Sequence, residues 1–292
     1  MRLAFAVCAS WILTAVALPS SPLGARETTH LTFGVYTSDK PTVMYRKFKL
    51  ILSSIEEKMT AQLDRDVKIK LQIYSRYRDA ILALVRGQVD FVRFGPASYV
   101  LANEENPKIE LLAIEENEGK RRFQGVIFCR KDSSIESLRD LKGKRFAFGD
   151  ENSTIGRFLA QAKLVEAGIH WDDLAHKEYL GRHDRVVTAV LHRRFDAGAA
   201  KIRTFLKYKD RGLRALEYFD NVTKPWVARE GLDPDTLREL REALLSMKNP
   251  RALKSIGKKL SGFGRVRDSE YDFVRAGMKR ARAFRPEKTA SR

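Results

Sequence analysis

The chain has 292 residues, of which 43% are hydrophobic and 10% aromatic, and it carries a formal net charge of +18. This content of apolar side chains excludes an intrinsically disordered chain and suffices for packed cores. At roughly 100–200 residues per domain, the length predicts about two domains.

The first 25 residues have the pattern of an export signal. Arg2 gives a basic start, residues 3–18 are almost wholly apolar, and small and polar residues follow. This stretch is typical of a signal peptide, because a membrane-spanning helix needs about 20 apolar residues. We expect residues 1–25 to be a signal peptide, cleaved after Ala17 or Ala25, and the mature protein to be periplasmic. A retained membrane anchor is the alternative.

Strand and helix patterns alternate in the segment that follows. Alternating or short apolar runs predict strands at residues 29–37, 67–75, 89–94 and 109–116. Apolar residues at helical spacing predict helices at residues 44–63 and 78–88, and a third helix begins after Gly95 and Pro96. This order is typical of a parallel sheet with helices on its faces.

A second α/β unit follows without a proline-rich linker. Cys129 lies in a strand-like run and is interpreted as a packed core thiol; it is the single cysteine left after signal cleavage, so no intramolecular disulfide is expected. Two such units predict a ligand cleft between them. The pattern predicts a strand at residues 122–133, then a short helix, a glycine-bearing turn and a strand within residues 134–150. Helices are predicted at residues 153–169 and 183–194, a short strand entering a helix at residues 195–205, a strand near residues 213–218, and long helices from Pro234 onward.

The residues from Ser153 to Gly156 stand where a predicted strand passes into a helix. The first backbone N–H groups of a helix lack intrahelical partners and the helix dipole is positive there, so the hydroxyls of Ser153 and Thr154 would complete an anion cradle. Gly156 would let a ligand approach the backbone. Ser98, after the Gly-Pro turn of the first unit, repeats the arrangement. Ordinary N-capping is the alternative for each turn, but two such turns facing one cleft favour an oxyanion ligand.

Several segments together resemble a known family. They read FGVYTSDKP, GQVDFVRFGPASYV, CRKDSSIESLRDLKGKRFAFGDENST, GRHDRVVTAVLHRRFDAGAA and KPWVAREGLDP. Over about residues 31–283, the chain is similar to the phosphonate-, phosphite- and phosphate-binding proteins of ABC importers. The resemblance implies an α/β fold of the type II periplasmic binding protein class, with two lobes and a cleft between them. Lobe 1 would hold residues 27–116 and 218–292, and lobe 2 would hold residues 117–217.

The resemblance also implies where the ligand binds. The oxyanion-binding positions of the family fall on Ser153, Thr154 and His183. Aromatic side chains would line the cleft; these are Tyr77, Phe94 and Phe123.

Two departures from the family pattern bear on the choice of ligand. Ile155 replaces the second serine of the usual Ser-Thr-Ser-Gly, which removes one hydroxyl donor, and Arg157 follows. Arg203 and Lys224 stand where members that bind aminoalkylphosphonates have carboxylates. Because cations facing the ligand would repel its ammonium group, we expect an amine-free or more negatively charged anion. The alternative is that these basic side chains point outward into solvent.

The sequence therefore predicts the binding component of an ABC importer, which closes on an oxyanion and delivers it to a membrane permease. The alternative is a periplasmic sensing protein that partners a membrane histidine kinase. An enzyme is not expected, because the five histidines are scattered without metal-ligand spacing, and neither a metal nor another cofactor is expected. We expect the protein to be a monomer.

Positive charge is concentrated toward the C-terminus, where residues 241–292 hold 15 Lys and Arg against 5 Asp and Glu. A basic tail can indicate nucleic-acid binding, but an exported protein rarely meets nucleic acid, so no such partner is expected. We interpret this region as a solvated helical surface that faces an anionic membrane or a protein partner. In the sensing alternative it would be the docking surface.

Overall fold

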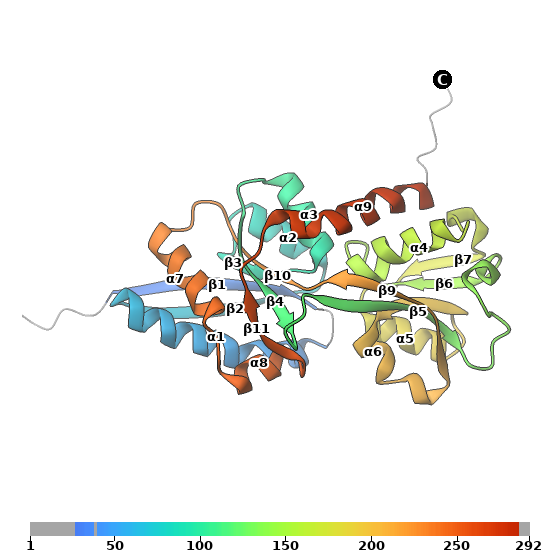
Figure 1. Ribbon diagram of the computed structural model, residues 1–292, viewed down its shortest axis with the longest axis horizontal. Coiled ribbons are helices and arrows are strands. Elements are labelled where there is room, and N and C mark those ends of the chain that lie inside the picture. The colour runs from blue at the N-terminus through green and yellow to red at the C-terminus, as the bar shows by residue number, and fades with distance from the viewer. Residues whose placement is uncertain (1–26, 38–39, 286–292) are drawn as a thin grey trace, which may run out of the picture.

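The computed structural model describes residues 27–37 and 40–285, which form two α/β lobes lying side by side (Figure 1). The predicted signal peptide, residues 1–25, lies outside the described residues. Within the described part of the chain, no helix is both long and apolar enough to cross a membrane.

Lobe 1 is built on a six-stranded sheet in the order β11-β4-β10-β3-β1-β2. β1 pairs in parallel with β2 and β3, as the alternation of strands and helices predicts, but β10 and β11 are antiparallel to their neighbours. The sheet is therefore mixed and not fully parallel, because β10 enters between β3 and β4 when the chain returns (Figure 1). Its strands are β1 (Thr28–Tyr36), β2 (Asp66–Tyr74), β3 (Phe91–Arg93), β4 (Glu110–Asn117), β10 (Pro225–Ala228) and β11 (Leu260–Gly264).

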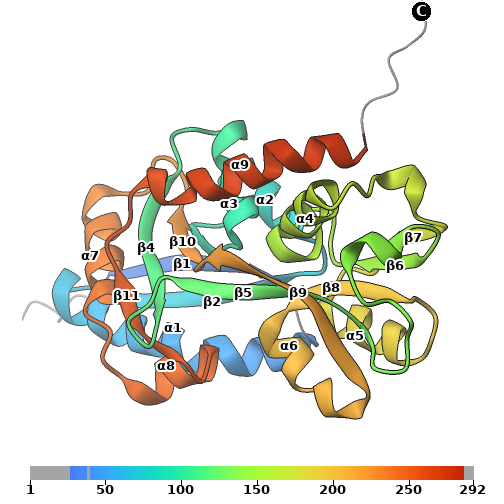
Figure 2. The same cartoon turned by 45° about the vertical axis from the view of Figure 1, so that its right-hand side comes forward.

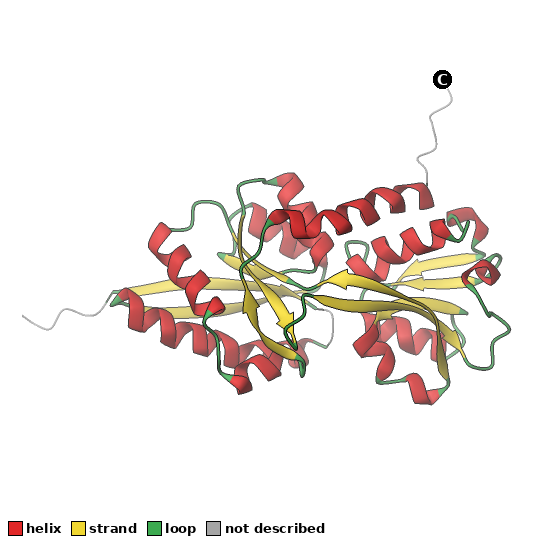
Figure 3. Cartoon of the chain, in the orientation of Figure 1, coloured by secondary structure: helices red, strands yellow, loops and turns green. Residues whose placement is uncertain are grey.

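Helices cover both faces of this sheet, so lobe 1 has two apolar cores (Figure 3). The predicted stripe on the first helix is confirmed, since Phe48, Ile51 and Ile55 are fully buried against the sheet. The helices on that face are α1 (Pro41–Leu63), α7 (Pro234–Leu245) and α8 (Pro250–Ile256), and those on the other face are α2 (Tyr77–Val85) and α3 (Pro96–Glu105).

Lobe 2 is built on a five-stranded sheet in the order β7-β6-β8-β5-β9. β6 pairs in parallel with β7 and β8, while β5 is antiparallel to β8 and β9. Cys129 is buried in one of its cores, as predicted. The elements are β5 (Arg122–Arg130), β6 (Arg145–Phe148), the π-helical turn η2 (Thr154–Leu159), α4 (Ala160–Glu166), β7 (His176–Tyr179), α5 (His183–Leu191), β8 (Ala197–Lys201), α6 (Ile202–Leu206) and β9 (Leu213–Val222), with short 3₁₀ turns η1 (Leu138–Leu141), η3 (Trp171–Asp173) and η4 (Lys209–Arg211).

The chain passes between the lobes twice. The first crossing lies between β4 and β5, close to the expected boundary after residue 116. The second lies at Thr223 and Lys224, beyond the expected boundary after residue 217, because the whole of β9 pairs with β5 in the sheet of lobe 2. Lys224 is thus a hinge residue that belongs to neither sheet.

The C-terminal helix α9 (Asp272–Ala281) bridges the two lobes, whereas the sequence places it with lobe 1 (Figure 2). It follows η5 (Asp268–Tyr271) and precedes η6 (Arg282–Phe284). On lobe 2, Arg280 Nη1 donates to Glu166 Oε1 at 2.7 Å, and Phe284 is buried in the core that contains Phe148. The two lobes are therefore linked by a helix as well as by the two crossings.

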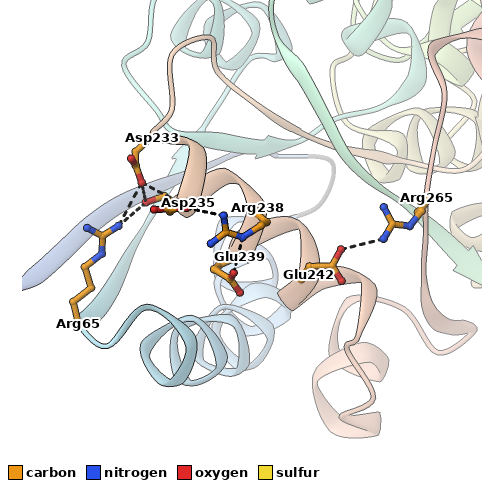
Figure 4. A network of polar contacts seen from close by, with 8 residues as sticks. Arg65, Asp233, Asp235, Arg238, Glu239, Glu242 and Arg265 are labelled. Atoms are coloured by element: carbon orange, nitrogen blue, oxygen red, sulfur yellow. Dashed lines mark hydrogen bonds and ion pairs between the residues drawn. The ribbon is translucent and has the colours of Figure 1, made fainter.

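Some basic side chains of the C-terminal region pair with neighbouring carboxylates. Figure 4 shows one such pair, in which Arg265 Nη2 donates to Glu242 of α7 at 3.2 Å, and a further pair on α7 just before this region, in which Arg238 Nη1 donates to Asp235 at 2.6 Å. These pairs are exposed, so each adds little to stability. The arrangement fits a solvated helical surface, one of the interpretations drawn from the sequence.

Candidate functional site

The carboxyl ends of the parallel strands of both lobes face each other at the junction. In lobe 1 these ends lead into Tyr36, Tyr77 and Phe94, and in lobe 2 they lead into Ser153 and His183. In open α/β sheets, ligands bind outside the carboxyl ends of strands. Four of the predicted site residues therefore follow the carboxyl ends of parallel strands: Tyr77, Phe94, Ser153 and His183.

Ser153 caps the helical segment of lobe 2, and its Oγ accepts a hydrogen bond from Gly156 N at 2.9 Å. The alternative of ordinary capping is thus present, yet the hydroxyl keeps its own hydrogen to donate. Ser153 and Thr154 are only 3% and 5% exposed. The segment begins with a π-helical turn, a feature frequent at functional sites.

Gly156 is required by packing against backbone. A Cβ at this position would lie 2.7 Å from Gly149 Cα, and Gly149 N donates to Gly156 O at 2.7 Å. The turn after β6 thus packs against Gly156 and fixes the start of η2.

Thr154 connects the two lobes. Its Oγ1 accepts a hydrogen bond of 2.8 Å from Ala97 N, one of the first N–H groups of α3. Beside it, the fully buried Ser98 hydroxyl lies 3.1 Å from Tyr36 Oη, which in turn accepts from Gly95 N. The two predicted helix N-termini, one from each lobe, therefore meet.

His183 is the first residue of α5 and is 5% exposed. The chain reaches it from β7 through Gly181, whose N–H donates to Gly149 O at 3.1 Å. Because Gly149 also binds Gly156, the starts of α5 and η2 are tied to the same turn. His183 is thereby placed in the same corner of lobe 2 as Ser153.

Two of the three predicted aromatic residues stack on Tyr36. Tyr77 lies 3.5 Å from it between ring centroids, and Phe94 lies 5.9 Å from it. Phe123 stands apart on β5, where Lys224 Nζ lies 6.0 Å from its ring centroid. The central ring, Tyr36, was not singled out from the sequence. Its burial raises the pKa of the hydroxyl to about 12, so the phenol stays protonated at neutral pH.

Asp150 is a second residue that sequence reasoning missed. It follows β6 in lobe 2, yet burial raises the pKa of its carboxyl, while the backbone N–H groups of Asn152 and of Tyr77 in lobe 1 act in the opposite direction. A carboxylate of lobe 2 thus lies at the N-terminus of α2. The acidic residue in the Gly-Asp-Glu-Asn turn was the available signal.

Lys224 lies among a group of charges from both lobes. Burial lowers the pKa of its ammonium group to about 7, assisted by the neighbouring cations Arg93, Lys201 and Lys47 and opposed by Glu115. Glu115 is held by Arg93, whose Nη2 donates to Oε2 at 2.8 Å. Arg93 was missed because a lone cation in a strand gives no signal of its partner.

The other two predicted cations, Arg157 and Arg203, have surroundings that differ from those of Lys224. Arg157 Nη1 donates to Glu151 O at 2.7 Å, and its guanidinium lies 4.6 Å from the ring centroid of Phe158. Arg203 is exposed at the rim, where a Cβ on Gly257 of lobe 1 would lie 3.4 Å from its Nη1. For Arg203 the solvent-exposed alternative holds.

Two further features bear on the choice of site. Within the described ranges, no group of three or more His, Cys, Asp and Glu side chains is placed to hold a metal ion. A groove of about 400 Å³ lies outside the junction, between α4, β9 and α9, and is lined in part by Leu159, Tyr218 and Phe273. It shares no residue with the predicted set.

Curated proteins and solved structures that resemble this chain indicate its family. The curated relatives include a probable ABC transporter phosphite-binding protein of Prochlorococcus marinus, 27% identical over 74% of this chain and 77% of that protein. A phosphate-import protein of Mycolicibacterium smegmatis is 26% identical over 71% and 74% of the two chains. Among solved structures, the Prochlorococcus protein in complex with methylphosphonate has a TM-score of 0.73 at 23% identity, covering 86% and 97%.

The family model for the periplasmic substrate-binding proteins of phosphonate ABC transporters matches residues 33–271. Such proteins bind solutes and are not enzymes, and their fold is the two-lobed one seen here. The chain therefore belongs to the family of periplasmic substrate-binding proteins of phosphonate ABC transporters.

Proposed function

We propose that this chain captures a phosphonate, phosphite or phosphate anion between its lobes and delivers it to an ABC permease in the inner membrane. The observation that carries the proposal is the meeting of η2 and α3 through Thr154 and Ala97. Two helix N-termini that face each other make a positive, donor-rich corner, which suits an oxyanion. The relatives that bind phosphite or import phosphate support the same class of ligand.

The hydrogen bonds of the Ser153 and Thr154 hydroxyls indicate how each would hold the anion. Ser153 Oγ and Thr154 Oγ1 both accept backbone hydrogen bonds, so each directs its remaining hydrogen elsewhere. An oxyanion placed against them receives charge-assisted hydrogen bonds, which are stronger than neutral ones. His183, at the start of α5, supplies a third donor, and Tyr77 and Phe94 form the apolar side.

Closure of the lobes is the mechanism of capture. In the structure the lobes touch through Thr154 and Ala97, so a ligand enters only when they separate about the two crossings. Closing then removes water from the anion and strengthens each contact. The family match favours transport over the sensing alternative. We propose that the protein acts as a monomer in the periplasm after signal cleavage.

The charge around Lys224 selects against amines. An aminoalkylphosphonate would bring its ammonium group toward Lys224 and Arg93, and burying like charges together is unfavourable. An amine-free phosphonate, phosphite or phosphate avoids this repulsion. Arg157 and Arg203 contribute less, because the first is held by Glu151 and the second is exposed.

Titration calorimetry on protein purified from the periplasm tests the proposal. Methylphosphonate, phosphite and phosphate are titrated into the wild type and into His183→Ala, with His192→Ala, at the end of the same helix, as control. We expect at least one anion to bind the wild type and the control equally, and the His183 variant roughly 10–150-fold more weakly. Absence of binding by all three anions would refute the function.

A further inference from the structure

The end of β9 and the second crossing carry polar side chains that are buried without hydrogen-bond partners among the described residues. Asn221 and Thr223 are each 1% exposed. Among the described residues, none pairs with Asn221 Oδ1, Asn221 Nδ2 or Thr223 Oγ1. Most buried polar groups in proteins are satisfied, and each exception calls for an explanation such as a water or ligand contact. Three such atoms within three residues form an unusual concentration.

The Asn221 side chain lies on the face of the sheet that carries η2. Side chains two residues apart in a strand point to the same face, so Asn221 follows Phe219, and Thr223 comes directly after β9 ends at Val222. A side chain at Gly125 would collide with Phe219 and with Ile155 of η2, which identifies that face. Asn221 therefore points toward the segment that begins with Ser153 and Thr154.

Phe123 is a neighbour of both Asn221 and Lys224. Phe123 is the cross-strand partner of Asn221, so their side chains are neighbours on one face. Lys224 Nζ lies 6.0 Å from the Phe123 ring centroid, and Glu115 is the carboxylate whose charge acts on it. The carboxylate in its surroundings, Glu115, already binds Arg93 and the indole N–H of Trp226. The amide, the hydroxyl and the ammonium group thus come from four consecutive residues at the end of β9 and the second crossing.

We propose that Asn221, Thr223 and Lys224 form a second anion subsite, which holds a carboxylate-like group on the substituent of the ligand. The inference rests on the proposed function, since the phosphonate group occupies the corner of Ser153 and Thr154. The ligand is then a phosphonate, or a phosphate ester, with a second acidic group. The amide N–H of Asn221 and the hydroxyl of Thr223 donate to that group, and Lys224 supplies the opposite charge, whereas Asn221 Oδ1 only accepts and takes no part in this contact.

Structural water is the competing explanation for the partnerless atoms. A buried water makes about three hydrogen bonds to such groups. In that case Asn221 and Thr223 would serve stability alone and would not distinguish one ligand from another. The two explanations therefore differ in how a substitution changes the ratio of affinities for two ligands, and not in its effect on stability.

The experiment is calorimetry at fixed pH and salt with methylphosphonate, phosphonoacetate and 2-aminoethylphosphonate. The variants are Asn221→Leu, Thr223→Val and Lys224→Met. The control is Gln124→Leu, which removes an amide from the same strand pair but at an exposed position, where it binds Asp220. Circular dichroism and melting curves establish that each variant is folded.

We expect phosphonoacetate to bind the wild type and the control roughly 10-fold or more tightly than methylphosphonate. Each of the three variants should reduce that ratio, and Lys224→Met should bring it close to one. Equal affinity of both ligands for the wild type, or an unchanged ratio in all three variants, would overturn the subsite. Failure of all the phosphonates to bind would instead overturn the proposed function, and the subsite with it.

Discussion

Thr154 Oγ1 of lobe 2 accepts a hydrogen bond of 2.8 Å from the backbone N–H of Ala97 in lobe 1. The same hydroxyl therefore closes the lobes and, through its own hydrogen, faces the proposed anion. Contact between the lobes and contact with the ligand are coupled at one atom. This coupling explains why a threonine stands at the start of η2: its hydroxyl accepts a hydrogen bond from lobe 1 and can donate one to the ligand.

Replacing Thr154 by valine should remove both contacts while keeping the shape of the side chain. We expect a loss of about 1.5–3 kcal/mol in ligand binding, or roughly 10–150-fold in affinity. Thr154→Ser keeps the hydroxyl and should bind within a few-fold of the wild type. Calorimetry with the anion that binds best decides the matter; equal affinities of the valine and serine variants would contradict the assigned role.

Lys224 should make the stability of the ligand-free protein depend on pH. Its pKa falls from the ordinary value of 10.5 to about 7 in the folded protein. Between these two values the unfolded chain binds more protons, so the free energy of unfolding rises with pH across this window. The destabilising contribution of the buried charge is complete below pH 7 and is relieved as the pH rises.

The matched test of this dependence is Lys224→Met. At pH 6 the variant should be more stable than the wild type by on the order of 1–3 kcal/mol, and the gain should shrink toward pH 10. Chemical denaturation at several pH values measures the difference, in which other titrating groups cancel. A gain that is independent of pH would show that Lys224 does not titrate in this window.

Gly156 should be intolerant of any side chain. Alanine would place a Cβ 2.7 Å from Gly149 Cα, so η2 must shift away from the turn after β6. We expect a loss of about 1–3 kcal/mol in stability, together with weaker ligand binding. Gly262→Ala is the control, because a Cβ there would meet no atom within 4 Å. Equal melting temperatures of the two variants would refute the packing argument.

Discrimination against ligands with an amine should depend mainly on Lys224 and only weakly on Arg203. Lys224→Glu should improve binding of 2-aminoethylphosphonate relative to ethylphosphonate, because the like charge becomes an opposite one. Arg203→Glu should change that ratio less than about twofold, since the side chain is exposed and screened by salt. Competition binding at fixed salt gives both ratios. A larger change in this ratio from Arg203→Glu than from Lys224→Glu would show that Arg203, and not Lys224, discriminates against amines.

The regular elements of the fold were predictable where the side chains show a period. α1 was located from Phe48, Ile51 and Ile55, all of which are buried. β7 (His176–Tyr179) was not, because its residues HKEY are polar and it forms a sheet edge. β11 (Leu260–Gly264) contains two glycines, which weaken a strand signal. The insertion of β10 between β3 and β4 depends on pairing that no local pattern encodes.

The candidate site was predictable only where a motif marks a helix start. Ser153 and His183 stand at such starts and were found. Arg93 and Asn221 were not found, because their roles depend on partners far away in the sequence. Arg93 pairs with Glu115 on another strand, and Asn221 is notable only because it is buried without a partner. Burial of a polar side chain is a property of the folded chain, so the local sequence does not indicate it.

The central claim is that an anion containing phosphorus binds at the junction of η2 and α3. A crystal structure of the protein grown with methylphosphonate tests it most directly. We predict phosphonate oxygens within hydrogen-bond distance of Ser153, Thr154 and His183. A phosphonate bound instead in the groove beside Leu159 and Phe273, or density for it nowhere between the lobes, would contradict the account.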